Sequence, residues 1–458
     1  MADRLMTMHQ STALLTDMYE LTMVESTLQS GAADRESVFE VFSRRLPAGR
    51  RYGVVAGTGR ILEQLADFRF SDAELSYLRE HRIVSESTID WLADYRFTGD
   101  IYGYREGECF FPGSPILTVT GTFAEAVLLE TLILSILNHD AAVAAAASRM
   151  TIAAHGRPCL EMGARRTHEQ AAVAAARAAV VGGFAGTSVL EAGRMYGIRA
   201  IGTAAHSFTL VHDTEEDAFA AQIATMGTDT TLLVDTFDVR RGVERAVRAA
   251  RDAGGELGAI RLDSGDLVAQ AITVRRQLDE LGATGTKITV TSDLDEYAIA
   301  ALGAAPVDSY GVGTKLVTGS GFPTAELVYK LVAREDSRGH IREVAKKSAS
   351  KGSVGGLKVA GRLRDEDGVA REELIISCAS WEQGFEKLDE MGARPLQVPL
   401  VLAGEVQSHV TAQEAAAHHV QSRNELPYQA WRLSEGEAAI PSTMIDIFPG
   451  DQNPYDGT

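Results

Sequence analysis

The chain has 458 residues, of which 45% are hydrophobic, and this is enough for two or three domains with sizeable cores. Its formal net charge of −19 excludes a bulk electrostatic attraction to nucleic acid or to an anionic membrane, so an anionic ligand needs a local cluster of basic groups. Its three cysteines, Cys109, Cys159 and Cys378, lack the spacing of a disulfide framework or of a cysteine metal site.

The N-terminal residues lack the apolar core of a signal peptide. The most apolar segment, 124–150, contains Glu125 and Glu130, and its uninterrupted apolar stretches are too short to span a bilayer. It is expected to form one or two buried helices. We therefore expect a soluble, cytoplasmic protein.

Residues 1–125 are expected to form a mixed α+β domain. Apolar periodicity and glycine or proline breaks define its elements. In chain order they are a helix within 11–30, a strand over 37–47, a turn and helix over 49–65, a polar helical segment over 71–98, and short antiparallel strands over 98–123.

Residues 126–335 alternate between short apolar runs and helix-like segments such as 169–180 and 243–254. Seven apolar runs between Leu160 and Thr314 each end at polar or glycine residues. Strand, helix and strand at this spacing indicate a parallel α/β sheet or barrel. Because the strands of such a barrel open on one face, and that face carries the active site, the residues that end the seven runs are expected to line one pocket.

Residues 336–458 are expected to pack partly with the N-terminal domain. Strand-like sequence recurs at 357–364 and, as further short strands, over 374–410. The predicted fold is therefore α/β, an irregular TIM-like barrel with an N-terminal α+β domain that C-terminal strands complete. The segment 346–358 is rich in Lys, Ser and Gly and could wrap a polyphosphate, although a solvated loop explains its composition equally well.

His206 ends the third run and Asp235 ends the fourth. A histidine at a strand end that faces a polar pocket can act as a base, an acid or a nucleophile. Asp235, on the next strand, is well placed to orient the imidazole ring. A structural histidine that bonds a backbone carbonyl would give the same sequence signal.

Arg261 and Asp263 lie two residues apart on a predicted strand, so their side chains point to the same face. Arginine can bind a phosphate with two hydrogen bonds, and aspartate can accept from a ribose hydroxyl or hold Mg²⁺. The pair suits a substrate that carries both phosphate and hydroxyl groups. A structural ion pair is the alternative.

Gly311 and Gly313 occupy a turn from a strand to a helix at the end of the seventh run. Backbone N–H groups in such a turn can hold a phosphate, and the last two loops of TIM-type barrels often do so. An ordinary tight turn would explain the same glycines. Arg165 and Arg166 are adjacent at the end of the first run, so that one of them can reach the pocket while the other faces out.

Several stretches together resemble nicotinate phosphoribosyltransferases. They are TDMYELTM, GARR, FAGTS, GTAAHSF, VDTFD, IRLDSGD, TSD, YGVGT and KKSASKGS, in this order along most of the chain. The succession of GTAAHSF and RLDSGD is specific, whereas any one stretch alone is weak evidence.

The resemblance implies an enzyme that joins nicotinate to 5-phosphoribosyl 1-pyrophosphate and releases nicotinate mononucleotide and pyrophosphate, in NAD salvage. It implies a ligase-type coupling to ATP hydrolysis through a phosphorylated histidine. It also implies a homodimer with shared active sites. Mg²⁺ would bridge the pyrophosphate without a dedicated protein metal site.

The resemblance also implies residue roles. The catalytic residues would be His206, which becomes phosphorylated, Asp235 and Asp263. The substrate-binding residues would be Tyr19, Arg165, Ser188, Arg261, Gly311, Gly313 and Thr314, with Tyr19 reaching the site of the neighbouring subunit. Arg44, Lys346, Lys347 and Lys351 resemble contacts to pyrophosphate or ATP.

The nicotinamide enzymes share the barrel but carry an aspartate where this chain has Ser188. A serine hydroxyl can donate to a carboxylate, whereas an aspartate would repel it, so Ser188 favours nicotinate. Met162 stands where those relatives carry a stacking phenylalanine, which leaves pyridine packing to Tyr19 and other residues. Two further alternatives stay open: a quinolinate phosphoribosyltransferase, and a catalytically inactive barrel that binds nucleotides.

Overall fold

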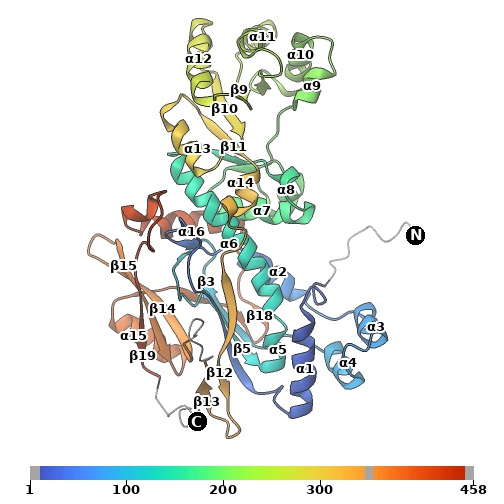
Figure 1. The fold of residues 1–458 in the computed structure, drawn as a ribbon, viewed down its shortest axis with the longest axis vertical. Coiled ribbons are helices and arrows are strands. Elements are labelled where there is room, and N and C mark those ends of the chain that lie inside the picture. The colour runs from blue at the N-terminus through green and yellow to red at the C-terminus, as the bar shows by residue number, and fades with distance from the viewer. Residues whose placement is uncertain (1–10, 346–353, 449–458) are drawn as a thin grey trace. The chain divides into compact units, whose positions relative to one another are not determined.

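The structure is a computed structural model that describes residues 11–345 and 354–448. The chain divides into two compact units, Met1–Ala141 with Thr324–Thr458, and Ala142–Pro323 (Figure 1). The first boundary falls inside helix α6 (Glu130–Ala153), and the predicted domain boundaries lay after residues 125 and 335. The described C-terminal residues group with the N-terminal ones.

The first unit contains a seven-stranded antiparallel sheet with the order β13-β12-β1-β5-β3-β17-β18. Its strands are β1 (Glu36–Ser43), β3 (Asp100–Tyr104), β5 (Leu117–Thr122), β12 (Leu327–Glu335), β13 (Ile341–Glu343), β17 (Gln397–Leu402) and β18 (Glu405–Val406). Strand β1 pairs with β12 on one side and β5 on the other. Strands from both ends of the chain therefore form one sheet, as predicted.

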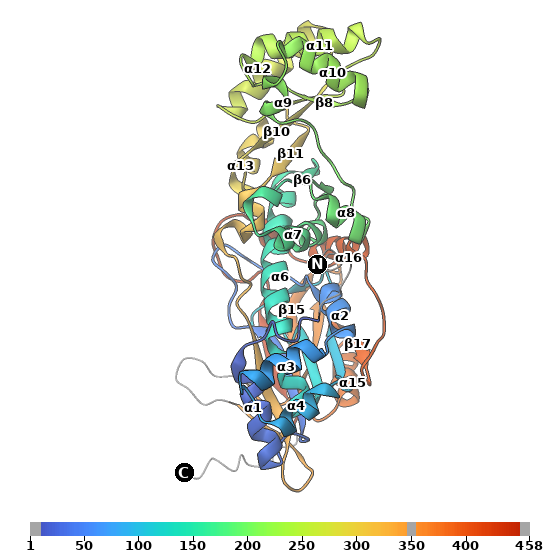
Figure 2. The same cartoon turned by 90° about the vertical axis from the view of Figure 1, so that its right-hand side faces the viewer.

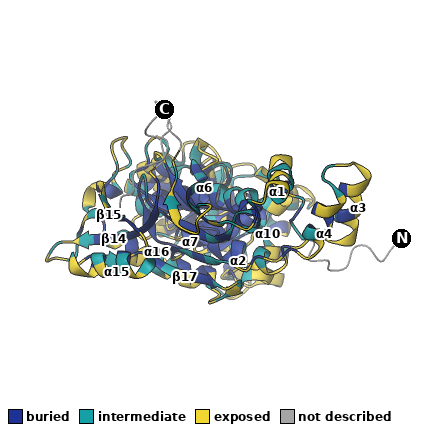
Figure 3. Ribbon diagram, turned by 90° about the horizontal axis from the view of Figure 1, so that it is seen from below, coloured by how far each residue is buried: buried dark blue, intermediate teal, exposed yellow. Residues whose placement is uncertain are grey.

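The first unit also contains helices and two smaller sheets. The helices are α1 (Met18–Ser30), α2 (Thr58–Ala66), α3 (Asp72–Glu80), α4 (Glu86–Ala93), α5 (Phe123–Val127), α15 (Trp381–Glu390), α16 (Ala412–Asn424) and the 3₁₀ helix η5 (Tyr428–Trp431). The smaller sheets contain β2 (Gly53–Val54) with β4 (Cys109–Phe110), and β14 (Leu357–Arg364), β15 (Ala370–Cys378), β16 (Arg394–Pro395) and β19 (Ser442–Asp446). Helix α3 buries Leu75 and Leu78 and is otherwise mostly exposed (Figure 3).

Helix α15 differs from the prediction, because short strands were expected throughout 374–410. The helix begins after Ser380, whose side chain accepts a hydrogen bond from the N–H of Gln383. A serine before such a segment is a helix-start signal that the sequence analysis did not use. By contrast, the prediction of buried helices after residue 123 is confirmed. The run Phe123–Ala153 is apolar and long enough to cross a membrane, but 67% of its most apolar window is buried, as in a core helix.

The second unit is built on six parallel strands in the order β7-β6-β11-β10-β9-β8. They are β6 (Cys159–Glu161), β7 (Gly186–Thr187), β8 (Thr231–Leu233), β9 (Ala259–Leu262), β10 (Lys287–Ser292) and β11 (Ser309–Val312). Six of the seven predicted runs form strands. The third run contributes only a parallel bridge from Ala200 to Thr187.

Helices follow most of these strands. They are α7 (Glu169–Val181), α8 (Leu190–Tyr196), α9 (His206–Leu210), α10 (Glu215–Met226), α11 (Val239–Asp252), α12 (Leu267–Glu280), α13 (Glu296–Ala301) and α14 (Thr314–Val317), with 3₁₀ turns η2 (Ala164–Arg166), η3 (Leu302–Ala304) and η4 (Gly319–Gly321). Helices α10, α11 and α12 lie together beside β8, β9 and β10 (Figures 1 and 2). Since all six strands are parallel, their carboxyl ends lie at one edge of the curled sheet, which positions the site.

Candidate active site

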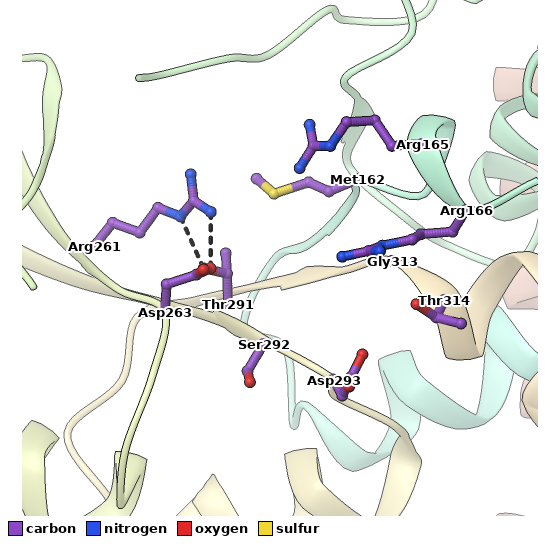
Figure 4. A pocket seen from close by; sticks show the side chains of 10 residues that line it. All are labelled: Met162, Arg165, Arg166, Arg261, Asp263, Thr291, Ser292, Asp293, Gly313 and Thr314. Carbon is purple, nitrogen blue, oxygen red and sulfur yellow. Dashed lines mark hydrogen bonds and ion pairs between the residues drawn. The ribbon is translucent and has the colours of Figure 1, made fainter. Parts of the chain in front are cut away.

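A cavity of about 210 Å³ lies at the carboxyl ends of β6, β9, β10 and β11. Its lining residues are Met162, Arg165, Arg166, Arg261, Asp263, Thr291, Ser292, Asp293, Gly313 and Thr314. Figure 4 shows Arg261 on one side of the cavity and Arg165 and Arg166 on the other. The fold therefore gathers the ends of the first, fifth, sixth and seventh predicted runs around one space.

Arg261 and Asp263 form an ion pair at the end of β9. The Nη2 atom of Arg261 lies 2.8 Å from Oδ1 of Asp263, and Nε of Arg261 donates to the hydroxyl of Thr291 at 2.8 Å. The Thr291 hydroxyl in turn donates to Asp263 Oδ1. The second carboxylate oxygen of Asp263, Oδ2, lies 4.0 Å from Nε2 of His206, and 33% of this side chain is exposed. Both functional groups are thus held rigidly at the cavity.

The pKa of Asp263 is lowered by its surroundings. Burial alone would raise this pKa, but the hydrogen bonds from Thr291 and Arg261 and the charge of Arg261 outweigh it. Asp263 is therefore a carboxylate at neutral pH. It can accept hydrogen bonds from hydroxyl groups or bind a cation.

The side chain of Asp235 is buried, and its Oδ2 atom accepts hydrogen bonds from the N–H of Asp263 at 2.8 Å and the hydroxyl of Ser264 at 3.0 Å. Its Oδ1 atom has no hydrogen-bond partner in the described structure and lies 4.0 Å from Nε2 of His206. A distance of 4.0 Å is too long for a hydrogen bond. Asp235 therefore supports the turn after β9 directly and His206 only electrostatically.

His206 begins helix α9, and 41% of its side chain is exposed. Its Nδ1 atom lies 3.1 Å from the hydroxyl of Thr236, and its Nε2 atom lies 4.0 Å from carboxylate oxygens of both Asp235 and Asp263. The Nε2 atom is thus equally close to two carboxylates and makes no hydrogen bond within the described residues. Thr236, the nearest partner of the ring, was not among the predicted site residues.

The opposite side of the cavity is basic. Arg165 and Arg166 lie on the 3₁₀ turn η2, and both are exposed to the cavity, so the adjacent pair does not divide between inside and outside (Figure 4). Gly313 and Thr314 continue this wall at the end of β11. Three guanidinium groups around so small a space favour a polyanionic ligand.

Gly311 lies within β11, before the cavity wall. A Cβ atom at this position would lie 2.5 Å from Cγ2 of Thr291 and 2.6 Å from the sulfur of Met162. Such contacts are too close for any side chain. Packing against Met162 and Thr291 therefore explains this glycine, and its predicted role at a phosphate stays a prediction.

The comparisons with known proteins agree with this geometry. Residues 14–138 match the family described as the nicotinate phosphoribosyltransferase N-terminal domain. A nicotinate phosphoribosyltransferase of Mycobacterium tuberculosis is 52% identical over 440 residues, which cover 94% of this chain and 95% of the relative. This chain belongs to the nicotinate phosphoribosyltransferase family. A Bacillus subtilis nicotinate phosphoribosyltransferase is 39% identical over 332 residues, covering 71% and 68% of the two chains.

Solved structures share the fold. The human nicotinic acid phosphoribosyltransferase matches with a TM-score of 0.78 and 23% identity, covering 94% of this chain and 97% of that one. A nicotinate-nucleotide pyrophosphorylase of Pyrococcus furiosus matches with a TM-score of 0.73 and 24% identity, covering 92% and 98%. At such identities the likeness establishes the fold alone, and it confirms the predicted fold class.

Other residues predicted from the family belong to the first unit or lie outside the described residues. Tyr19 and Arg44 belong to the first unit, and 45% of Tyr19 is exposed. The Tyr19 hydroxyl donates a hydrogen bond to Glu130, and burial followed by the charges of Glu130 and Glu20 raises the pKa of Tyr19. Lys346, Lys347 and Lys351 lie outside the described residues, so that their predicted contacts stay predictions.

Ser188 directly follows β7, and its N–H donates to the carbonyl of Glu161 at 2.8 Å. Glu161 is one residue that the sequence analysis of this family member missed. It is fully buried at the end of β6, and its carboxylate accepts from the Gly163 N–H and the Thr187 hydroxyl. Burial raises the pKa of Glu161, while these hydrogen bonds oppose the shift. The only signal in the sequence was an acidic residue at the end of an otherwise apolar run.

Proposed function

We propose that this protein is a nicotinate phosphoribosyltransferase. It joins nicotinate to 5-phosphoribosyl 1-pyrophosphate, and it releases nicotinate mononucleotide and pyrophosphate as a step of NAD salvage. The observation that carries the proposal is the cavity in which the paired Arg261 and Asp263 face Arg165 and Arg166. The relative that is 52% identical bears the name of this activity.

The cavity suits the bond that must break. The bond between C1 of the ribose and the pyrophosphate breaks as positive charge develops on the sugar, so catalysis depends on neutralising the departing pyrophosphate and positioning the pyridine nitrogen. Arg165 and Arg166 supply positive charge for the phosphates, and the Asp263 carboxylate can hold the ribose hydroxyls. No protein nucleophile is needed for this step.

We propose Mg²⁺ as the metal cofactor, carried by the pyrophosphate. The described residues contain no group of three or more His, Cys, Asp or Glu side chains that could hold a metal alone. Asp263 and Asp293 both line the cavity and offer the carboxylate oxygens that Mg²⁺ prefers. Two carboxylates beside a bound pyrophosphate fit the usual way in which this ion binds. When bound, Mg²⁺ would neutralise charge on the pyrophosphate.

ATP is the proposed co-substrate. His206 presents an Nε2 atom that can attack the terminal phosphorus of ATP, which forms a phosphohistidine and releases ADP. Water then cleaves the N–P bond and releases phosphate. Asp235 and Asp263, each 4.0 Å from Nε2, are placed to stabilise the cationic ring from which a phosphoryl group departs.

The proposed base is nicotinate because Ser188 can donate to its carboxylate. We further propose a cytoplasmic homodimer in which Tyr19 covers the pyridine ring in the site of the neighbouring subunit. The exposed Tyr19 side chain is compatible with such a contact. Arg44, also exposed, is proposed as a pyrophosphate or ATP contact.

The test is an incubation of the purified protein with 5-phosphoribosyl 1-pyrophosphate, Mg²⁺ and ATP, with nicotinate, nicotinamide or quinolinate supplied in parallel. We expect mononucleotide, measured by mass, from nicotinate, and we expect ATP to increase its yield. Product from nicotinamide alone would overturn the role of Ser188, and product from quinolinate with loss of CO₂ would change the reaction. If ligands bind but no base reacts, the protein is an inactive nucleotide-binding barrel and the proposal is wrong.

A further inference from the structure

We propose that Glu161 is a positioning residue that holds Ser188, the proposed partner of the nicotinate carboxylate, in a fixed place relative to the turn that carries Arg165. This inference rests on the proposed function. Arg165 lies on the turn after β6, and Ser188 lies directly after β7. Neither side chain is held by the strands themselves, because both lie beyond the last paired residues, Glu161 and Thr187.

The Glu161 carboxylate joins these two segments. Oε1 accepts a hydrogen bond from the N–H of Gly163, in the turn that carries Arg165. Oε2 accepts from the hydroxyl of Thr187, the residue before Ser188. The carbonyl of Glu161 also accepts from the Ser188 N–H at 2.8 Å. One buried residue thus contacts both the turn after β6 and the segment after β7.

The turn after β6 packs closely against the Glu161 carboxylate. A Cβ atom at Gly163 would lie 2.3 Å from Cγ1 of Val317 and 3.0 Å from Oε1 of Glu161, so only glycine lets the backbone approach so closely. Two further bonds stabilise the same turn: the Met162 N–H donates to Val312 and the Arg166 N–H donates to Gly163, both at 2.8 Å. The carboxylate therefore meets a backbone N–H group in a well-defined place.

The hydroxyl of Thr187 is also oriented toward Glu161. The Thr187 hydroxyl oxygen accepts the N–H of Val189 at 3.0 Å, so that its proton is free to point at Glu161. The Thr187 hydroxyl therefore contacts Glu161 and also binds the backbone of Val189, so the residues on both sides of Ser188 are held. A shift of this segment would move the Ser188 hydroxyl relative to the ligand.

Simple packing does not account for the carboxylate. Strands β6 and β7 already pair through Leu160 with Gly186 and Glu161 with Thr187. An apolar side chain of similar size would fill the same buried space without the cost of burying a charged group. The carboxylate instead links the turn that carries Arg165 to the segment that carries Ser188. Precise binding sites require rigid support of this kind.

The experiment compares Glu161→Leu, Glu161→Gln and Thr187→Val in steady-state assays with nicotinate and nicotinamide. We expect Glu161→Leu to raise KM for nicotinate about tenfold or more and to lower the preference for nicotinate over nicotinamide, while KM for phosphoribosyl pyrophosphate rises by a smaller factor. Thr187→Val should change KM in the same direction by a smaller factor. Glu161→Gln, which keeps the acceptor for Gly163, and Thr187→Ser should restore most of the loss.

Thr286→Val is the matched control. Thr286 is buried at the amino-terminal end of β10, and its hydroxyl donates to the Leu257 carbonyl at 2.8 Å. Its loss should lower the melting temperature and leave the KM for nicotinate unchanged. Equal rises in both KM values in Glu161→Leu and Thr187→Val, or a nicotinate KM within twofold of wild type in Glu161→Leu, would overturn the inference. If the Leu variant does not fold, Thr187→Val decides by the same two criteria.

Failure of the inference can be told apart from failure of the proposed function. A wild-type protein that turns over nicotinate supports the function, whatever the variants show. A wild-type protein that uses none of the bases removes the function and, with it, the basis of the Glu161 proposal.

Discussion

Arg261 and Asp263 are two residues apart on one strand and bonded to each other at 2.8 Å, with Thr291 of the neighbouring strand donating to Asp263 and accepting from Arg261. The arginine is therefore partly neutralised by its own strand, while Oδ2 of the aspartate lies 4.0 Å from Nε2 of His206. This arrangement makes Asp263 the acceptor of the pair and leaves most of the free positive charge in the cavity to Arg165 and Arg166.

Replacing Asp263 tests this division of roles. Asp263→Asn removes the charge but keeps the size, and we expect kcat/KM for phosphoribosyl pyrophosphate to fall by about 10²–10³-fold, the usual range for the loss of a preorganised charged contact. Initial rates at varied substrate concentration measure this. Thermal unfolding should show that the variant is folded, and a loss smaller than threefold would contradict the assignment.

His206→Ala should abolish ATP coupling. The uncoupled reaction should persist, but the ratio of ADP to mononucleotide should fall to zero, because no ring nitrogen remains to accept the phosphoryl group. The wild-type protein incubated with γ-labelled ATP should carry an acid-labile label that the variant lacks. Unchanged coupling in the variant would place the phosphorylation elsewhere.

Ser188→Asp should reverse the choice of base. A second carboxylate beside that of nicotinate is repulsive, so kcat/KM for nicotinate should fall by about 10²-fold while nicotinamide gains. Parallel assays with the two bases give the ratio directly. Retention of the wild-type ratio would show that Ser188 does not contact the base.

Glu20 should make stability fall with rising pH. It is fully buried in the first unit, and burial raises its pKa to about 7 although Thr131 and Thr16 donate to it. Because the folded state binds the proton more tightly, the stabilisation present below about pH 4.5 is lost as pH rises to about 7, by at most about 1.4 kcal/mol per unit. Glu20→Gln should become more stable relative to wild type across this window in chemical denaturation. A pH-independent difference would contradict this.

His419, in contrast to Glu20, should make stability fall as pH falls. It is buried in α16, where desolvation lowers its pKa to about 4 and its Nδ1 lies 2.9 Å from the Gly107 carbonyl. The unfolded state gains the proton first, so stability is lost as pH falls from about 6.5 toward 4. His419→Gln should reduce this acid sensitivity, measured as melting temperature against pH. An equally steep loss in the variant would assign the acid sensitivity to other groups.

Much of the second unit was predictable because its signals are local. Short apolar runs that end at Arg261, Asp263 and Asp293 mark strands whichever way the chain folds, and parallel strands bring such ends to one edge. The third run was harder, since only Ala200 pairs, through a bridge to Thr187. The helix at Trp381–Glu390 was missed because a propensity for short strands was given more weight than its serine cap.

The sequence by itself determined the family, the parallel α/β class and the strand ends that carry the polar residues. Only the tertiary structure decided which groups meet. Glu161 joins Thr187, 26 residues away, and Asp235 bonds the Asp263 N–H, 28 residues away, rather than the ring of His206. Both contacts join the ends of neighbouring strands, β6 with β7 and β8 with β9, in the sheet order β7-β6-β11-β10-β9-β8. Hydrogen bonds act over about 3 Å, so only the assembled sheet selects the partners.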